Sequence, residues 1–182
     1  MFEAQTKPMT TDEFIAYALL PENAERNLEF INGEIFEKMP GSTENSGIAA
    51  NLVFETRLHC QVNTLSCFVS TGDGAYRIGP HVIAPDFAYK PTSLTKEYPD
   101  PEPPLWAAEV ISPNDKVIEI NAKRRKYIEA GILYWELYPD ERLIDVYAPD
   151  KPMVTMATYG INDTIAVSVI SGLTIPVAKL FR

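Results

Sequence analysis

Two acidic residues interrupt apolar, strand-like runs in the middle of the chain, and they constrain the fold more than any other feature. Asp86 lies inside the run 82–89, and Glu109 lies inside the run 105–111. We therefore expect each run to form a strand that carries one carboxylate. An ionised carboxylate is costly to bury unless it is paired, protonated or bound to a metal. A divalent cation would satisfy both groups at once.

The residues that follow Glu109 carry the signals of a helix start. Ser112 supplies an N-cap hydroxyl, Pro113 suits the first helical position, and Asp115 is an acid three residues past the cap. This pattern predicts a helix that begins directly after the Glu109 strand.

A basic group on this expected helix is placed to meet the carboxylates. At about 100° per residue, Lys123 falls on the stripe that should face the sheet, and Arg124 lies near that stripe. Arg125 and Lys126 point away from it, which favours a solvated helix face for both. Lys123 is therefore the first candidate for an inward cation, and Arg124 is the alternative.

The expected pair of acids favours a hard metal ion. Oxygen ligands from Asp86 and Glu109, with a backbone carbonyl and water, are typical of Mg²⁺ or Mn²⁺ sites. Such an ion lowers the pKa of a bound water and neutralises charge that develops on a phosphate. Lys123 is placed to orient the water or to stabilise the oxyanion.

The order and spacing of these residues resemble the PD-(D/E)XK nuclease superfamily. Within it the chain is similar to the Uma-two family of restriction-endonuclease-like proteins, in which the motif lysine has moved to the helix after the glutamate strand. Ile111 stands where the standard motif has lysine, in agreement with this variant. The resemblance covers about residues 10–147 and rests on Pro85-Asp86, Glu109-Val110-Ile111-Ser112-Pro113, Lys123, Tyr127, Gly131 and Tyr134-Trp135.

The resemblance implies an α/β (α+β) fold, with a restriction-endonuclease-like mixed β-sheet flanked by helices, an N-terminal helix and a β-hairpin. It also implies hydrolysis of DNA phosphodiester bonds, with Asp86, Glu109 and Lys123 as catalytic residues and the two acids as metal ligands. The family's opening hairpin has a recurrent acid beside the turn glycine, and Glu34 corresponds to that acid. The superfamily and the aromatic stretch 134–138 together favour a homodimer.

A second function class stays open, namely a catalytically inactive nuclease-fold binding module for nucleic acid or protein. A net charge of −9 and a pI near 4.7 oppose non-specific attraction to a phosphate backbone. Structural roles are also available, because Asp86 could cap a turn, Glu109 could pair with Arg77, and Lys123 could extend to water. The presence of all three motif residues favours the enzyme.

The composition suits a single domain, residues 1–182, with 46% hydrophobic residues. The sequence shows no apolar run long enough to cross a bilayer, and its N-terminus does not resemble a signal peptide, so we expect a cytoplasmic protein without a membrane partner. Cys60 and Cys67 are predicted to be free thiols, because two cysteines and two histidines do not assemble a convincing zinc site.

Three elements are expected before the first acidic run. The segment 10–20 predicts an amphipathic helix with a capping box. Strands 28–31 and 34–38 flank Asn32-Gly33, a dipeptide that fits a two-residue hairpin. Ser42 is expected to cap a helix that ends near Cys60.

The second expected helix leaves further site residues undecided. Asn45 stands where the family often has a histidine, and Glu44 and Glu55 are alternative acids that the sequence does not rank. After the Lys123 helix, the strand 132–137 makes a crossover unit that favours parallel neighbours. The remaining expected strands are 66–70, 75–78 and 143–147, together with 153–158 and 165–169 as a pair, and 90–104 is expected to be an ordered, proline-rich loop.

Overall fold

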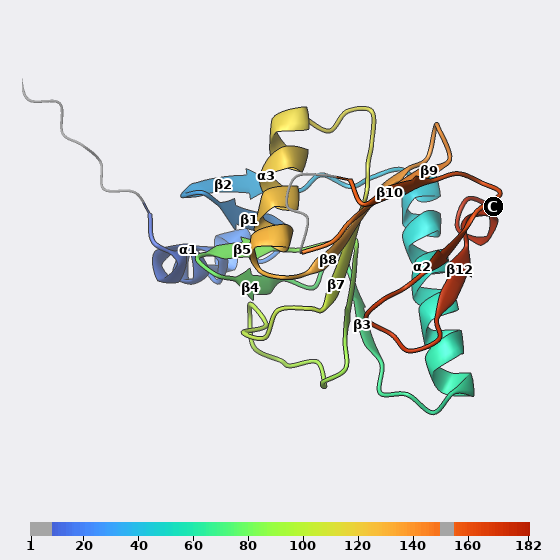
Figure 1. Ribbon diagram of the computed structural model, residues 1–182. Coiled ribbons are helices and arrows are strands. Elements are labelled where there is room, and N and C mark those ends of the chain that lie inside the picture. Colours follow the sequence, from blue (N-terminus) through green and yellow to red (C-terminus); the bar gives the residue numbers. More distant parts are fainter. Residues whose placement is uncertain (1–8, 150–154) are drawn as a thin grey trace, which may run out of the picture.

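The computed structural model describes residues 9–149 and 155–182. A six-stranded mixed sheet runs through the centre of the molecule (Figure 1). Its strand order is β10-β9-β8-β7-β6-β3. The strands are β3 (Phe68–Thr71), β6 (Phe87–Lys90), β7 (Trp106–Val110), β8 (Leu133–Tyr138), β9 (Leu143–Tyr147) and β10 (Ala157–Tyr159).

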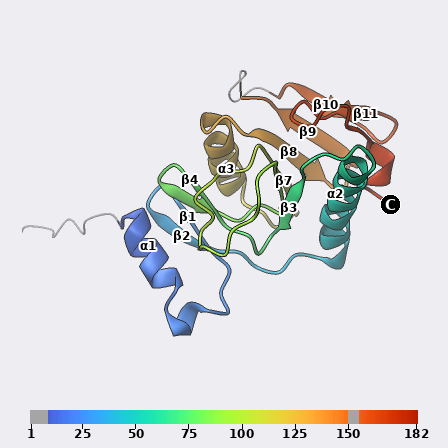
Figure 2. The same cartoon turned by 90° about the horizontal axis from the view of Figure 1, so that it is seen from below.

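Two smaller sheets lie on opposite sides of this central sheet (Figures 1 and 2). The four-stranded sheet has the order β2-β1-β5-β4, built from β1 (Leu28–Ile31), β2 (Glu34–Glu37), β4 (Tyr76–Ile78) and β5 (His81–Ile83). The third sheet pairs β11 (Thr164–Ala166) with β12 (Thr174–Pro176). The helices are α1 (Thr11–Ala18), α2 (Thr43–Val62) and α3 (Val117–Glu129), with short 3-10 turns η1 (Pro21–Asn23) and η2 (Val177–Lys179).

Alternation along the central strands gives the sheet two different faces. On β7, Trp106 and Ala108 pack into the larger core cluster with α2, β11 and β12. Ala107 points the other way, into the cluster that contains Tyr127 of α3 and Tyr76 of the four-stranded sheet. Because side chains alternate along a strand, Glu109 must share the α3 face with Ala107.

The unit β7–α3–β8 is the crossover expected from the sequence. Strand β7 pairs with β8 in parallel, whereas β6, β9 and β10 pair antiparallel with their neighbours. This confirms a mixed sheet with a helix that returns over one face. Figure 1 shows α3 on that face and α2 on the opposite one.

The N-terminal elements form as their local sequence predicts. Thr10 caps α1 in a complete capping box with Glu13. Asn32 and Gly33 both adopt positive φ, 54° and 88°, and close a tight turn between β1 and β2. Ser42 caps α2 by accepting a hydrogen bond from the Asn45 N–H, and α2 ends two residues beyond the expected Cys60.

The expected strand over residues 82–89 is wrong, because the run divides into two strands of different sheets. Val82 on β5 pairs with Phe30 of β1, whereas Phe87 begins β6 in the central sheet. Pro85 between them has no N–H to donate, and its ring disfavours helical and continuous ladder geometry at the junction. Asp86 therefore lies at the crossing between two sheets and outside any strand.

The expected start of the third helix is also wrong. Helix α3 begins at Val117, with Lys116 at the N-cap and no side-chain cap. Ser112 and Asp115 instead close a turn, in which the Ser112 N–H donates to Asp115 Oδ2 at 2.7 Å and the Asp115 N–H donates to the Ser112 carbonyl at 3.0 Å. Short polar side chains compete with helix formation in this way.

The C-terminal strands pair differently from the prediction. The expected strand 153–158 begins outside the described residues, and the observed β10 adds to β9. Strand β11 pairs with β12 and forms no ladder with β10. The segment between β6 and β7 is an irregular loop, as expected, and its Asp100 lies 2.7 Å from the buried ammonium of Lys90 at the end of β6. Within the described residues, no helix is long and apolar enough to cross a membrane.

Candidate functional site

The antiparallel register of β6 and β7 brings the two predicted acids together. Phe87 pairs with Ala108, so the next step of the same register places Asp86 opposite Glu109. Asp86 is fixed there because its Oδ2 accepts a hydrogen bond of 2.8 Å from the Val110 N–H. Glu109 is almost fully buried, at 6% exposure, on the α3 face of the sheet.

Lys123 reaches this acid pair from the facing stripe of α3. Its Nζ lies 3.2 Å from Glu109 Oε1, which also accepts a hydrogen bond of 3.0 Å from the Tyr127 hydroxyl. The contact between Lys123 and Glu109 agrees with the predicted inward orientation. A lysine on the helix thus meets the strand glutamate although Ile111 occupies the usual lysine position.

Glu29 is a further contact of Lys123, and it was not among the residues predicted from the sequence. Its Oε2 lies 2.8 Å from Lys123 Nζ, and its Oε1 accepts a hydrogen bond of 3.0 Å from the Ala84 N–H. Glu29 is 3% exposed on β1, inside the apolar run 28–31. The signal that pointed to Asp86 and Glu109, an acid inside an apolar run, was therefore present here as well.

Lys38, directly after β2, is the second residue that sequence reasoning missed. Its Nζ lies 2.7 Å from Asp86 Oδ1, 2.9 Å from the Ala84 carbonyl oxygen and 3.6 Å from Glu109 Oε2. A lysine at a strand end is usually a solvated residue, so no sequence signal separates it from others. The residues Glu29, Lys38, Asp86, Glu109 and Lys123 are called the charged cluster below.

Burial and neighbouring charges set the protonation of the charged cluster. Burial raises the pKa of Glu109 above its ordinary value, and attraction to Lys123 and Lys38 offsets only part of that shift. For both lysines burial acts to lower the pKa, but the surrounding carboxylates outweigh it, so each pKa lies above its ordinary value. Both lysines therefore remain cations, and neither is a general base at neutral pH.

The oxygen donors of the charged cluster fit a divalent cation in kind but are few. Asp86 Oδ1, Glu109 Oε2 and the Ala84 carbonyl surround one point, the position taken by Lys38 Nζ. Carboxylate and carbonyl oxygens are the ligands that Mg²⁺ and Mn²⁺ prefer, and Mg²⁺ usually keeps several waters. Among the described residues, no group of three or more histidine, cysteine or acidic side chains is arranged to hold a metal ion.

Other sequence candidates lie away from these contacts. Glu34 is exposed at the start of β2, and Glu44 is exposed in the first turn of α2. Glu55 is buried but pairs with Lys179 and Arg182, at 2.8 and 3.1 Å, which ties α2 to the C-terminal segment.

The side chains of Arg77 and of the aromatic stretch 134–138 were also singled out in the sequence. Arg77 pairs with Asp12 at 3.3 Å, so the suggested pair between Arg77 and Glu109 is wrong. Tyr134 and Trp135 are fully buried in the two core clusters. They belong to the core because β8 is a central strand, whereas Tyr138 at the end of the aromatic stretch 134–138 is partly exposed.

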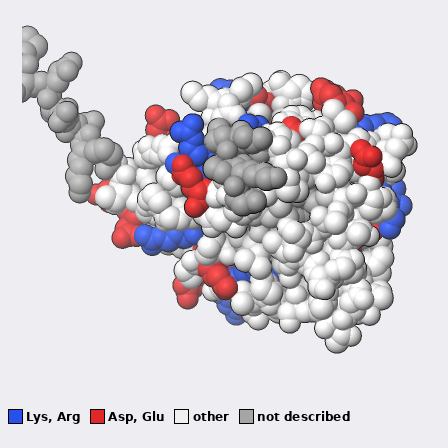
Figure 3. Space-filling model, in the orientation of Figure 1, with Lys and Arg blue, Asp and Glu red and all other residues white. Residues whose placement is uncertain are grey.

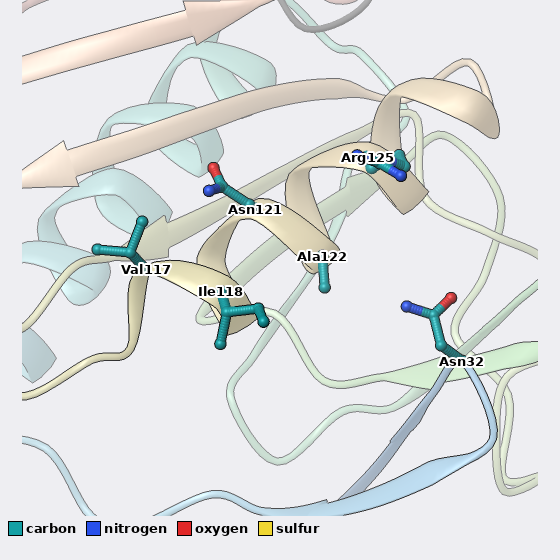
Figure 4. Close-up of a pocket in the computed structure, with 6 residues that line it drawn as sticks. All are labelled: Asn32, Val117, Ile118, Asn121, Ala122 and Arg125. Carbon is teal, nitrogen blue, oxygen red and sulfur yellow. The ribbon is translucent and has the colours of Figure 1, made fainter.

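An open pocket of about 560 Å³ lies between α3 and the β1–β2 turn (Figure 4). Asn32 stands across from the helix, and Arg125 contributes the pocket's cation. None of the residues that line the pocket belongs to the charged cluster. The lining residues are Asn32, Val117, Ile118, Asn121, Ala122 and Arg125.

Surface charge does not form a uniform basic face on the side seen in Figure 3. Acidic and basic side chains lie next to each other there, in keeping with the net charge of −9. On helix α3, Arg124 turns inward to Glu136, and Lys126 pairs with Glu129 at 3.1 Å. Arg125 is exposed and lines the pocket.

The mixed sheet with a crossover helix, an acid just before β6 and an acid on β7 with lysines beside them fit the restriction-endonuclease-like class. Residues 11–178 match the model of the Uma2 family, which is described as "Putative restriction endonuclease". The chain belongs to this family, and the resemblance read from the sequence is confirmed.

A solved structure supports the same fold. The crystal structure of "a putative nuclease belonging to DUF820" from Anabaena variabilis is similar, with a TM-score of 0.76 and 22% sequence identity. The match covers 96% of this chain and 98% of that chain. The expected fold class is thereby confirmed. No curated protein matches the chain.

Proposed function

We propose that the protein is a metal-dependent endonuclease that hydrolyses DNA phosphodiester bonds. The observation that carries the proposal is the meeting of Asp86, Glu109 and Lys123 on the α3 face of the sheet, with Lys123 Nζ 3.2 Å from Glu109 Oε1. The charge pattern is that expected for phosphate chemistry, in which acids hold a cation and a lysine faces the reacting group. Membership of the Uma2 family supports the same reaction class.

Asp86 and Glu109 are the proposed ligands of Mg²⁺ or Mn²⁺. When bound, such an ion supplies a water of lowered pKa and neutralises charge on the phosphate. Val110 holds Asp86 through its N–H, and Tyr127 holds Glu109 through its hydroxyl, so both carboxylates keep a fixed orientation. Hydrogen bonds of this kind to ligating carboxylates orient the ligands and tune the affinity of a metal site.

Lys123 is the proposed cation for the reacting phosphate. Its raised pKa keeps it protonated, so it stabilises negative charge and does not accept a proton. Glu29 holds Lys123 from the opposite side, at 2.8 Å, and thereby positions it. The exposed Glu34 is retained from the family resemblance as a proposed additional acid of the substrate-bound site.

We propose that the substrate contacts the pocket beside α3. Arg125 offers a guanidinium, and Asn32 and Asn121 offer amides, which are common donors to phosphate oxygens. We also propose a homodimer, because cleavage of both strands of a duplex is most direct with two sites, and we propose that the protein acts in the cytoplasm.

One observation favours the alternative function, an inactive nuclease-fold module that binds nucleic acid or protein. Lys38 Nζ lies among the same oxygens that a metal would need, 2.7 Å from Asp86 Oδ1. A permanent lysine in that place would exclude the ion and leave only a binding surface. The two functions therefore differ in whether the protein cleaves DNA or only binds nucleic acid or protein.

A nicking assay on supercoiled plasmid tests the proposal. The protein is incubated with Mg²⁺, Mn²⁺ or a chelator, beside Asp86→Asn and Lys123→Met. We expect metal-dependent nicking that falls at least about 100-fold in each variant, the scale for loss of one charge-stabilising group. Linear duplex, branched and single-stranded DNA are then compared as substrates.

Matched controls guard this assay against contaminating nucleases. Asp140→Asn and Lys96→Met make the same chemical changes at exposed positions outside the charged cluster. Both should nick at the parental rate. If Asp86→Asn and Lys123→Met also cleave at that rate, the activity does not belong to this site. A parent that shifts DNA in a gel but never nicks it supports the binding module instead.

A further inference from the structure

Lys38 has contacts that the proposed reaction does not explain. Its ammonium lies 2.7 Å from Asp86 Oδ1, 2.9 Å from the Ala84 carbonyl and 3.6 Å from Glu109 Oε2. Two of these oxygens belong to the proposed metal ligands, and the third is a backbone carbonyl. The ammonium thus has the oxygen surroundings of a small cation.

A lysine can mimic a metal ion because its charge is compact. The ammonium group is a point charge with three donors on a flexible stem of four carbons. The Lys38 backbone is fixed, because its N–H donates to the Asn27 carbonyl at 2.8 Å. Only the side chain must move for the ammonium to leave the carboxylates.

The position of Lys38 permits such movement more readily than that of Lys123. The Lys38 and Asp86 side chains are 21% and 23% exposed, so the ammonium has a path to water. Lys123 is 14% exposed and is held between two buried glutamates, Glu29 at 4% and Glu109 at 8% side-chain exposure. The two lysines of the charged cluster are therefore unequal, and Lys38 is the one placed to leave.

Charge counting within the cluster points the same way. Three carboxylates, Glu29, Asp86 and Glu109, face two ammonium groups, which leaves one negative charge in surplus. With Lys38 withdrawn the surplus is two negative charges, which one divalent cation neutralises. A divalent ion bound while Lys38 stays in place would instead be repelled by a cation among its own ligands.

We propose that Lys38 is a tethered competitor for the divalent cation, occupying the Asp86 and Glu109 oxygens in the metal-free protein and withdrawing when the ion binds. The inference rests on the proposed metal site. Lys38 thereby controls the affinity of the site for the metal ion, a role that neither Lys123 nor the ligands Asp86 and Glu109 have.

Calorimetric titration with Mn²⁺ tests the competition without any nucleic acid substrate. Lys38→Met removes the competitor and keeps most of the side-chain volume, and it should bind Mn²⁺ at least about tenfold more tightly than the parent, because a tethered group acts at high local concentration. Lys96→Met makes the same change in net charge at an exposed position and should bind like the parent. Lys38→Met combined with Asp86→Asn should lose the gain.

A second measurement uses the unaltered protein and so does not depend on a variant that folds. Lysines are acylated briefly with and without Mg²⁺, and modification of Lys38 is quantified by mass spectrometry against Lys96 as internal reference. A withdrawn ammonium is released from its carboxylates, so Lys38 should be modified at least about threefold faster with Mg²⁺.

The outcomes separate this inference from the proposed function. Tighter binding by Lys38→Met together with faster acylation of the parent supports the competition, whether or not DNA is cleaved. Unchanged or weaker binding by folded Lys38→Met overturns it, even if the parent cleaves DNA with Mn²⁺. Binding by neither protein at millimolar Mn²⁺ overturns both the metal site and the competition.

Discussion

Two glutamates on neighbouring strands, Glu109 of β7 and Glu136 of β8, have equivalent positions in the sheet but different surroundings. They are register partners in the parallel pair and both face α3. Consecutive residues of that helix supply their cations, Lys123 to Glu109 and Arg124 to Glu136. Each glutamate also accepts a tyrosine hydroxyl. The difference between them separates a structural ion pair from a candidate site.

The Glu136 site is closed and balanced. Arg124 donates to both carboxylate oxygens, at 2.9 and 2.7 Å, and Tyr138 donates at 2.7 Å. Glu136 is fully buried, and the Arg124 guanidinium also lies over the Tyr147 ring at 4.5 Å. The rigid guanidinium fork suits a pair that never has to open.

The Glu109 site is partly open to solvent at Lys38 and Asp86, and it carries an excess of acid. Three carboxylates share two lysines, and each lysine contacts more than one of them. Lysines are compact charges that rearrange readily, in contrast to the arginine fork. We conclude that the first pair stabilises the fold, whereas the charged cluster holds like charges together at a cost, as functional sites often do.

The largest stability effect is expected from breaking the closed pair. Arg124→Met leaves Glu136 buried without its counter-charge, and the free energy of unfolding should fall by about 3–5 kcal/mol. Urea denaturation followed by circular dichroism measures it. Arg125→Met removes a neighbouring exposed cation and should change the free energy by less than about 0.5 kcal/mol. If both variants lose the same free energy of unfolding, the pair of Arg124 and Glu136 does not contribute specifically to the stability of the fold.

Much of the fold could be predicted because local signals agreed with the tertiary structure. The Asn32-Gly33 hairpin and the Thr10 capping box are present in the structure as the sequence predicted. Two of the failures, at Pro85 and at Ser112–Asp115, share a cause, since a proline or a short polar side chain is compatible both with a continued strand or helix and with a turn. Only packing against a second sheet or a helix decides between them.

The candidate site could be predicted only in part, for a physical reason. Asp86, Glu109 and Lys123 stood out because each charge was expected to face the core. Glu29 had the same signal and was overlooked, whereas Lys38 had none, because it enters the cluster through the chain path after the β1–β2 hairpin. Contacts between segments distant in sequence leave no mark in the local pattern.

A smaller effect of opposite sign is expected at the open cluster. Glu109→Gln leaves two acids for two lysines and should raise the free energy of unfolding by up to about 2 kcal/mol at pH 7. The pKa of Glu109 is raised by burial above its ordinary 4.5, so its ionisation opposes folding. The gain should therefore be full above the folded-state pKa, shrink as the pH falls through it, and vanish below about 4.5.

The matched variant at the closed site gives this prediction its control. Glu136→Gln leaves Arg124 without a counter-charge and should lower the free energy of unfolding at pH 7. Urea denaturation of both variants at several pH values compares the two glutamates directly. Destabilisation by Glu109→Gln as large as that by Glu136→Gln would show that the charged cluster is a structural network like its neighbour.

The smallest effects are expected from the two tyrosine hydroxyls. Tyr127→Phe removes a fully buried donor to Glu109 and should cost about 1 kcal/mol of unfolding free energy. Tyr138 is partly exposed, and Glu136 keeps both bonds from Arg124, so Tyr138→Phe should cost about half as much because water can replace the hydroxyl. Thermal and urea denaturation of the pair measure the difference. A larger loss of unfolding free energy in Tyr138→Phe than in Tyr127→Phe would mean that the pair of Arg124 and Glu136 depends strongly on the Tyr138 hydroxyl. The tyrosine hydroxyls, and not the type of cation, would then distinguish the two sites.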